Sequence, residues 1–130
     1  MFLDTSGLFC YHHADELRSD EAQILFEASG GKLTHSYVLA ELVALSSARG
    51  LPRPKTLAFV KSLLGHPEVE VVWVGAGLNE EAMDLLDARL DKDYSLCDAV
   101  SFVLMKQRGL REALTTDHHF EQEGFTRLLK

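Results

Sequence analysis

The chain opens with Met1-Phe2-Leu3-Asp4-Thr5-Ser6, in which three apolar residues run directly into an acid and two hydroxyl residues. The apolar run predicts a short buried strand, and a helix-like run begins at Ser6 and continues through His13. Parallel strands deliver their carboxyl ends to one edge of a sheet, where α/β proteins bind ligands. The opening therefore predicts Asp4 at a binding edge, although a turn or helix-capping role would suit it equally well.

Strands and helices alternate through the rest of the chain. Further strands are expected over residues 32–35, 69–74, 112–116 and 125–129, and further helices over residues 15–29, 37–49, 54–64, 80–90, 96–108 and 118–123. Ser36, Asn79 and Ser95 are the predicted N-caps of three of these helices. The alternation predicts an α/β fold with a mostly parallel sheet covered on both faces. A length of 130 residues suggests a single domain over residues 1–130.

Composition narrows the setting in which the chain works. A hydrophobic content of 46% with three prolines predicts a packed core. No apolar stretch approaches the ~20 residues of a membrane span, and the N-terminus has no export signal, so we expect no membrane association. Cys10 and Cys97 form neither a metal-ligand spacing nor a disulfide framework, which favours a cytoplasmic location.

The net charge of −7 argues against nucleic-acid binding through bulk electrostatics. Any contact with RNA must use a local basic patch or bridging cations. Arg49, Arg53 and Lys55 gather around one helix junction, and Lys92 and Arg108 flank another helix. Arg49, Arg53, Lys92 and Arg108 are the candidate guides for an RNA backbone, although solvated surface positions would explain them too.

Three further acids occupy positions comparable to that of Asp4. Asp117 ends the strand-like run 113–116, Asp98 lies in the first turn of a helix, and Glu41 interrupts an apolar helical stripe. Each of the first two has an ordinary alternative, since Asp117 could cap the short helix after it and Asp98 could complete a capping box with Ser95.

Glu41 is harder to assign to an ordinary role. Val38, Leu42 and Leu45 define the inward stripe of its helix, and Glu41 lies one turn from both Val38 and Leu45. No Lys or Arg one turn away can pair with it. A charge on the inward stripe needs a partner, so Glu41 is expected to join a functional cluster.

Four acids that meet at one edge would need a cation. Two carboxylates ~5 Å apart repel by roughly 3 kcal/mol at an effective dielectric near 20. Either some of them are protonated, or a divalent cation neutralises them. Hard oxygen ligands favour Mg²⁺ or Mn²⁺ over zinc. Ser6, Asp93 and Thr116 are the candidates for residues that support the ligands from behind, whereas adjacent histidines such as His118 and His119 favour a structural or surface role.

The motifs together resemble those of PIN-domain nucleases, and most closely the VapC-type toxins of toxin–antitoxin pairs. The specific segments are Val38-Leu39-Ala40-Glu41-Leu42, Asp93-Tyr94-Ser95-Leu96-Cys97-Asp98-Ala99, and Leu114-Thr115-Thr116-Asp117-His118-His119-Phe120, with the opening Asp4-Thr5-Ser6. The resemblance covers essentially the whole chain. It implies a three-layer α/β/α fold, and Mg²⁺- or Mn²⁺-dependent endonucleolytic cleavage of RNA by Asp4, Glu41, Asp98 and Asp117. It also implies a cognate antitoxin and a homodimer.

Other classes remain as alternatives at this point. An RNA-processing nuclease outside a toxin pair would have the same acids, and a catalytically silent RNA- or protein-binding scaffold could retain them. Phosphatases with an acidic nucleophile usually resemble Asp-x-Asp at the first strand end, whereas this chain has Ser6 at the second of those positions. Receiver domains usually carry a paired acid early in the chain and a late strand-end Lys, neither of which is found here.

Overall fold

The computed structural model describes all of residues 1–130. Its five strands are β1 (Phe2–Leu3), β2 (Lys32–His35), β3 (Val69–Val72), β4 (Glu112–Leu114) and β5 (Thr126–Arg127). Its seven helices are α1 (Thr5–His12), α2 (Ser19–Ala28), α3 (Ser36–Ala48), α4 (Arg53–Leu64), α5 (Ala76–Asp87), α6 (Leu96–Arg108) and α7 (His119–Gln122). No helix is long and apolar enough to cross a membrane.

The strands form one sheet in the order β3-β2-β1-β4-β5, and every neighbouring pair is parallel. The predicted mostly parallel sheet is confirmed and is parallel throughout. β1 is the central strand, and both Phe2 and Leu3 are fully buried. The carboxyl ends of β1 and β4 therefore lie side by side, which places Asp4 beside the segment that leads to Asp117.

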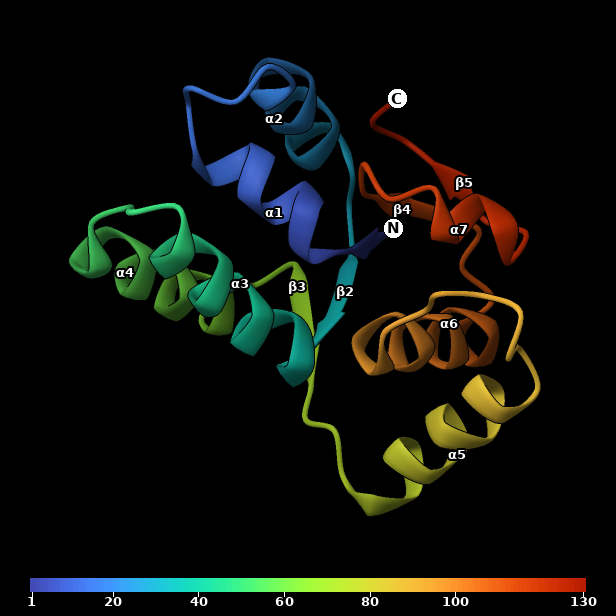
Figure 1. Ribbon diagram of the computed structural model, residues 1–130. Helices are drawn as coiled ribbons and strands as arrows, with labels where there is room; N and C mark the ends of the chain where they lie inside the picture. The colour runs from blue at the N-terminus through green and yellow to red at the C-terminus, as the bar shows by residue number, and fades with distance from the viewer.

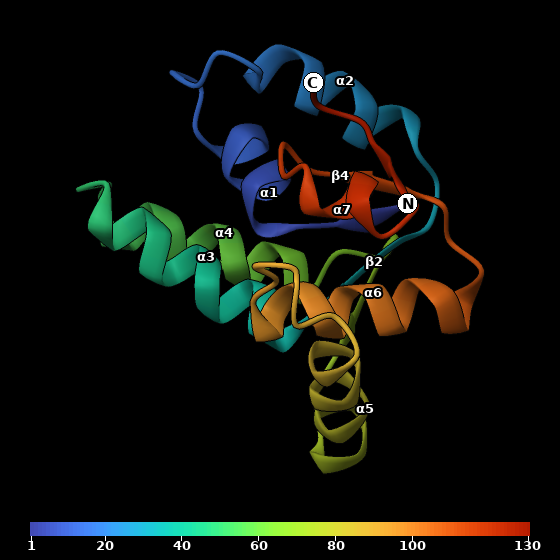
Figure 2. The same ribbon diagram turned by 45° about the vertical axis from the view of Figure 1, so that its right-hand side comes forward.

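Helices cover the sheet on both faces, which confirms the three-layer arrangement. α1 and α2 lie on one side of the sheet, whereas α5 and α6 lie on the other (Figure 1). α3 and α4 pack side by side and project from the body of the fold, as both views show (Figure 2). In the core, the rings of Phe102 and Phe120 meet at 4.9 Å between centroids, and Phe120 in turn packs on Phe2. These contacts attach α6 and α7 to the central strand.

One close approach sets the position of α1 against β4. A Cβ atom added at Gly7 would lie 1.8 Å from the carbonyl oxygen of Leu114. Real side chains do not fit such a space, so only glycine allows this helix to lie so close to the strand. Gly7 therefore controls the distance between the start of α1 and the end of β4, where Asp4 and Asp117 stand.

The caps of three helices show where local sequence patterns succeed and fail. Ser95 caps α6 as predicted, and it forms a complete capping box with Asp98. α3 is capped by the imidazole of His35, because the predicted cap Ser36 instead accepts a hydrogen bond from the Val74 N–H of the neighbouring segment. The predicted cap Asn79 is also wrong, because α5 begins at Ala76, before Asn79.

Asn79 lies inside α5, which begins at Ala76, and its side-chain oxygen accepts a hydrogen bond of 2.7 Å from the Tyr37 hydroxyl. This tertiary partner removes the need for a cap at that position. α2 likewise begins at Ser19 rather than near residue 15. The short segment before it forms turns that bring Glu16 and Arg18 toward neighbouring elements, through an ion pair of Glu16 with Arg49 and hydrogen bonds of Arg18 with the Lys130 carbonyl.

His35 is a fully buried residue with two polar partners. Its Nδ1 accepts from the Val38 N–H, and its Nε2 lies 2.9 Å from the Ser101 hydroxyl. Burial lowers the pKa of His35 to about 4, against an ordinary value of 6.5. Between these two values the unfolded chain binds more protons than the folded one, so the free energy of unfolding falls as the pH drops from about 6.5 to about 4.

The contribution of His35 to this loss is at most about 3 kcal/mol. This contribution can be measured by denaturant unfolding of the wild type and of His35→Asn between about pH 7 and pH 4.5. Asparagine keeps an oxygen for the Val38 N–H but takes up no proton. The variant should therefore be less stable at neutral pH and should lose less stability on acidification. Parallel pH profiles for the two proteins would show that His35 is not the group that titrates.

Candidate active site

Asp4 stands at the carboxyl end of the central strand, with its side chain almost fully buried. It occupies the N-cap position of α1 but makes no side-chain capping hydrogen bond, so the helix-capping alternative does not explain it. Instead its Oδ2 accepts a hydrogen bond of 2.7 Å from the Thr115 hydroxyl and a longer one of 3.3 Å from Ser6. These donors hold the carboxylate against the end of β4.

The pKa of Asp4 is raised to about 7, first by burial and then by the charges of Asp98 and Glu41, while the hydrogen bond from Thr115 acts against the rise. Asp4 is therefore near half-ionised at neutral pH. A cation at this position would favour the ionised form, because it would supply the attraction that burial removes.

Asp98 lies in the first turn of α6 and is also buried. Its Oδ2 accepts the Ser95 N–H at 3.1 Å as part of the capping box, and lies 3.1 Å from Nδ1 of His119. Burial raises the pKa of Asp98, and the nearby charge of Asp117 raises it further. The capping box and a second role are thus compatible, because capping uses only one of the two carboxylate oxygens.

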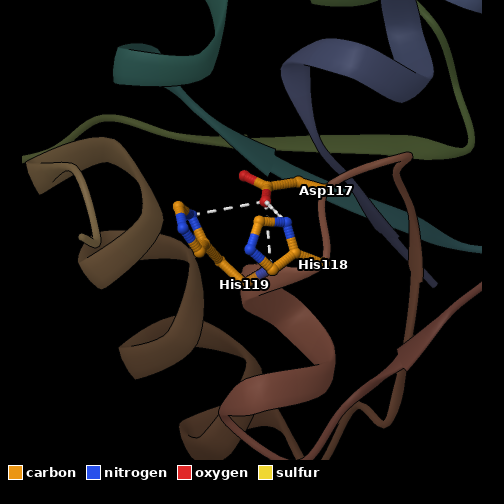
Figure 3. Close-up of side chains that lie close together, drawn as sticks. All are labelled: Asp117, His118 and His119. Atoms are coloured by element: carbon orange, nitrogen blue, oxygen red, sulfur yellow. Dashed lines mark hydrogen bonds and ion pairs between the residues drawn. The ribbon is translucent and has the colours of Figure 1, made fainter. Parts of the chain in front are cut away.

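Asp117 follows β4 and is joined to Asp98 by His119. Its Oδ1 accepts the backbone N–H of His119 at 2.9 Å, and the ring Nδ1 of His119 lies 3.3 Å from the same oxygen. Figure 3 shows one oxygen of the Asp117 carboxylate facing the imidazole rings of both His118 and His119. The carboxylate therefore accepts a hydrogen bond from the first turn of α7, as expected for a helix cap. It also lies beside the same histidine as Asp98.

The hydrogen bonds leave one oxygen of each acid available. Both backbone and histidine donors converge on Oδ2 of Asp98, and the backbone donor of α7 uses Oδ1 of Asp117. The hydroxyls around Asp4 likewise use only its Oδ2. Carboxylates that are oriented through one oxygen and open at the other are typical ligands of a hard divalent cation. The donor set of this edge therefore fits a divalent metal ion.

The structure corrects the sequence-based argument for Glu41. Its side chain is exposed, so it does not lie on a buried stripe and needs no partner there. The reason is that α3 projects from the body of the fold, which leaves one border of the stripe uncovered. Glu41 still belongs to the acidic edge, because its charge contributes to the raised pKa values of Asp4 and of the Cys97 thiol.

Of the three residues that were predicted to support the acids, Ser6 does so, whereas Thr116 and Asp93 do not. Ser6 contacts Asp4 as expected, and its hydroxyl also accepts the backbone N–H of Thr116. Thr115, rather than Thr116, supplies the hydroxyl that contacts Asp4. Asp93 is exposed and makes no hydrogen bond or ion pair. Side chains alternate across a strand end, so a shift of one residue decides which threonine faces the acids.

The predicted RNA guides do not form one patch. Arg108 makes an ion pair of 2.8 Å with Glu70 and lines a pocket at the amino ends of the strands, so it lies at the wrong edge of the sheet for this site. Lys92 pairs with the adjacent Asp91, and Arg53 donates to Ser47 at the junction of α3 and α4. Arg49 alone lines a pocket of about 210 Å³ together with residues at the acidic edge, Ser6 and Thr116 among them.

His119 is the residue of the site that sequence reasoning missed. Adjacent positions were expected to point the two rings apart, but the rings of His118 and His119 lie 4.6 Å apart between centroids and both lie beside Asp117. Burial distinguishes them instead, because the side chain of His118 is 64% exposed, against 18% for His119. The ring of His119 packs edge-on against Tyr94 at 5.4 Å between centroids. The Tyr94 hydroxyl in turn donates to the buried Glu123. The Asp-His-His sequence signals the histidine, but only the tertiary contacts choose between the two.

A second arrangement of metal ligands is present at the same place. Asp117, His118 and His119 each offer one ligand atom, and these atoms lie within 4.8 Å of one another. No three of the four predicted acids are grouped this closely. The histidine nitrogens would suit a softer ion than the carboxylates do. The contacts of His119 with Asp98 favour a supporting role for this ring instead.

Comparisons with known proteins identify a matching family model, a relative in two strains and a similar solved structure. The family model described as PIN domain matches residues 1–125. The chain is 30% identical over 126 residues to the 23S rRNA-specific endonuclease VapC20 of Mycobacterium tuberculosis, in two strains, covering 96% of this chain and 95% of that protein. The crystal structure of VapC20, described as a sarcin-ricin loop cleaving toxin, is similar with a TM-score of 0.89 and 28% identity, covering 99% of this chain and 98% of that one.

Proposed function

Because the chain belongs to the PIN-domain family, whose nucleases depend on divalent metal ions, we propose that it is a metal-dependent endoribonuclease and the toxin of a toxin–antitoxin pair. The observation that carries the proposal is the set of three aspartates at one edge of the sheet, each held through one oxygen by donors of the chain. A scaffold that only binds a partner has no need to keep buried carboxylates with raised pKa values together.

Asp4, Asp98 and Asp117 are the proposed metal ligands, with Glu41 at the exposed border of the site. Mg²⁺ or Mn²⁺ is the proposed ion, since both accept carboxylate and water ligands. When bound, such an ion supplies an activated water and shields the charge of the scissile phosphate. His119 holds Asp98 and Asp117 in place, and Thr115 and Ser6 hold Asp4. Glu41, being exposed, is free to orient a water molecule.

The proposed substrate is 23S rRNA at its sarcin–ricin loop, by analogy with the relatives named above. Loop RNA suits the geometry, because the attacked phosphate must approach carboxylates that are largely buried at a sheet edge. A flexible strand bends into such a position more easily than a rigid duplex. Under this proposal the protein acts in the cytoplasm, where ribosomes are.

A cognate antitoxin and a homodimer complete the proposal. The acids at the sheet edge offer an arginine of an antitoxin a bidentate partner. Exposed apolar side chains, including Trp73 at 68% and Leu17 at 91%, supply surface for protein contacts. Co-purification with the product of the neighbouring gene, followed by mass measurement of the complex, tests both partners. A monomer without a bound partner would count against the toxin assignment but not against the nuclease.

Cleavage of a synthetic sarcin–ricin hairpin tests the activity directly. The purified chain should cut the hairpin in the presence of Mg²⁺ or Mn²⁺, and EDTA should stop the reaction. A hairpin of the same length with an unrelated loop serves as the control substrate. Binding without cleavage in either metal would favour the scaffold alternative. Equal cleavage of both hairpins would retain the nuclease and reject the proposed substrate.

The two neighbouring histidines provide a matched test of how the site is built. His119→Ala removes the ring beside Asp98 and Asp117, so we expect metal affinity and cleavage to fall by about 10- to 100-fold. His118→Ala changes an exposed ring and should leave both within about twofold. Mn²⁺ titration and cleavage rates give the two readouts. Equal losses in the two variants would instead favour the Asp117, His118 and His119 group as the metal ligands.

A further inference from the structure

A second pocket, of about 430 Å³, lies where the end of α1 meets the start of α4. We call it the α1–α4 pocket. Its polar lining consists of His12 from α1, His13 and Asp15 from the segment after α1, and Lys55 and Thr56 from α4. It shares no residue with the candidate active site, and the proposed cleavage reaction does not use it.

The polar side chains of this pocket have no partners within the chain. The side chains of His12, His13 and Lys55 make neither a hydrogen bond nor an ion pair, although the ring of His12 is held by stacking on Phe59 at 4.3 Å. Thr56 is only 3% exposed, and its hydroxyl has no hydrogen-bond partner. A buried hydroxyl without a partner is unfavourable, and Thr56 is a lining residue of the pocket.

The start of α4 adds further donors. Pro52 occupies the N-cap position and supplies no side-chain cap, so the backbone N–H groups of Arg53 and Lys55 remain without an acceptor. The amino end of a helix carries partial positive charge and attracts anions. α4 is 12 residues long, which makes it a full helix rather than a single turn.

The ionisable groups of the lining are one lysine, two histidines and one acid. Burial lowers the pKa of His12, and the nearby His13 and Lys55 lower it further, which indicates that the three groups lie close enough to repel one another when charged. Asp15 is the one acid in the lining, and it is exposed and pairs with none of them. An anion in the pocket would pair with Lys55 and supply acceptors for the unpartnered donors.

The pocket is aligned with the acidic edge along α1. This helix starts directly after Asp4 and leads away from the sheet edge toward α4 (Figure 1). The smaller pocket that contains Ser6, Phe9 and Arg49 lies between the two, and His12 lines the α1–α4 pocket. With a rise of 1.5 Å per residue, His12 lies about 12 Å from Asp4 along the helix.

We propose that the α1–α4 pocket binds a phosphate group of the RNA backbone, on the strand that carries the phosphate that is cut. The inference rests on the proposed function and extends it, because it assigns a route for the substrate along α1. In a chain of net charge −7, such a local site provides the attraction that the overall charge does not.

Inorganic phosphate is the first probe. Titration of the ¹⁵N-labelled wild type should shift the amide resonances of residues 12–15 and of Arg53, Lys55 and Thr56 in a saturable manner. Thr56→Val removes the hydroxyl, so we expect weaker phosphate binding together with an unchanged or higher melting temperature. Absence of shifts in these segments in the wild type would overturn the pocket as an anion site, whether or not the protein cleaves RNA.

The second measurement uses the RNA hairpin and a matched pair of lysines. Lys55→Gln should raise KM by about fivefold with kcat nearly unchanged, and should lower the slope of log affinity against log salt by about one. Lys61→Gln makes the same charge change on an exposed position of the same helix that does not line the pocket, and should leave both values unchanged.

The outcomes separate this inference from the proposed function. Phosphate-dependent shifts without a difference between the two lysine variants would overturn the assignment to RNA. If the wild type cleaves no RNA, the proposed activity fails. The same salt titration of RNA binding, followed by fluorescence anisotropy, then decides the RNA assignment without reference to cleavage.

Discussion

Asp4→Asn is expected to lower cleavage of the RNA hairpin by at least about a hundredfold and, at the same time, to raise the melting temperature of the metal-free protein. Loss of a residue that only supports a metal ligand typically lowers metal affinity or activity by about 10- to 100-fold. Loss of a proposed ligand should therefore lower cleavage by at least about a hundredfold. Asparagine keeps an oxygen for the Thr115 hydroxyl, so the local hydrogen bond survives.

The stability gain follows from the pKa of Asp4. Its folded value of about 7 lies above the ordinary 3.8, so the folded chain binds more protons than the unfolded one between these values. The free energy of unfolding therefore falls as the pH rises from about 3.8 to about 7, and the loss is complete above that. It amounts to at most about 4 kcal/mol, which the neutral asparagine avoids.

The two readouts together make the experiment decisive. Mg²⁺ or Mn²⁺ should stabilise the wild type, because the ion binds only the folded state, but it should stabilise Asp4→Asn much less. Asp84→Asn makes the same chemical change on the exposed face of α5 and serves as the control. Equal cleavage by wild type and Asp4→Asn would indicate a contaminating nuclease. A destabilised Asp4→Asn protein would show that Asp4 serves the fold rather than a cation.

Gly7→Ala is expected to destabilise the chain by about 3 kcal/mol or more, even though alanine is the better helix former. The added Cβ would meet the Leu114 carbonyl oxygen at 1.8 Å, the carbonyl carbon at 2.5 Å and the Leu114 side chain at 2.9 Å. A backbone atom of the central sheet cannot move aside cheaply. α1 would have to shift away from β4, which would also move Asp4 relative to Thr115.

Gly77 provides the matched control for this substitution. It also lies in a helix, α5, but a Cβ there would meet nothing within 4 Å. Gly77→Ala should therefore stabilise the chain by about 0.5–1 kcal/mol. Denaturant unfolding of the two variants gives opposite signs if close packing is the cause. A Gly7→Ala protein as stable as the wild type would mean that the approach of α1 to β4 is not as tight as described.

The sequence alone determined the features that depend on neighbours along the chain. Alternating apolar runs and helical patterns predicted the α/β class and the parallel sheet, because periodicity and connection length are local properties. The positions of Asp4 and Asp117 after strands followed from the same pattern. The capping box of Ser95 and Asp98 was also predictable, since both partners lie within one turn.

Only the tertiary structure decided which side chains face the acids. His119 rather than His118 contacts Asp98, and Thr115 rather than Thr116 contacts Asp4, although the two residues of each pair are neighbours in the sequence. Glu41 is exposed because α3 projects beyond the sheet, and Arg108 is distant because α6 carries it to the opposite edge. These outcomes depend on how helices pack against strands that are far away in the chain, and periodicity carries no information about such packing.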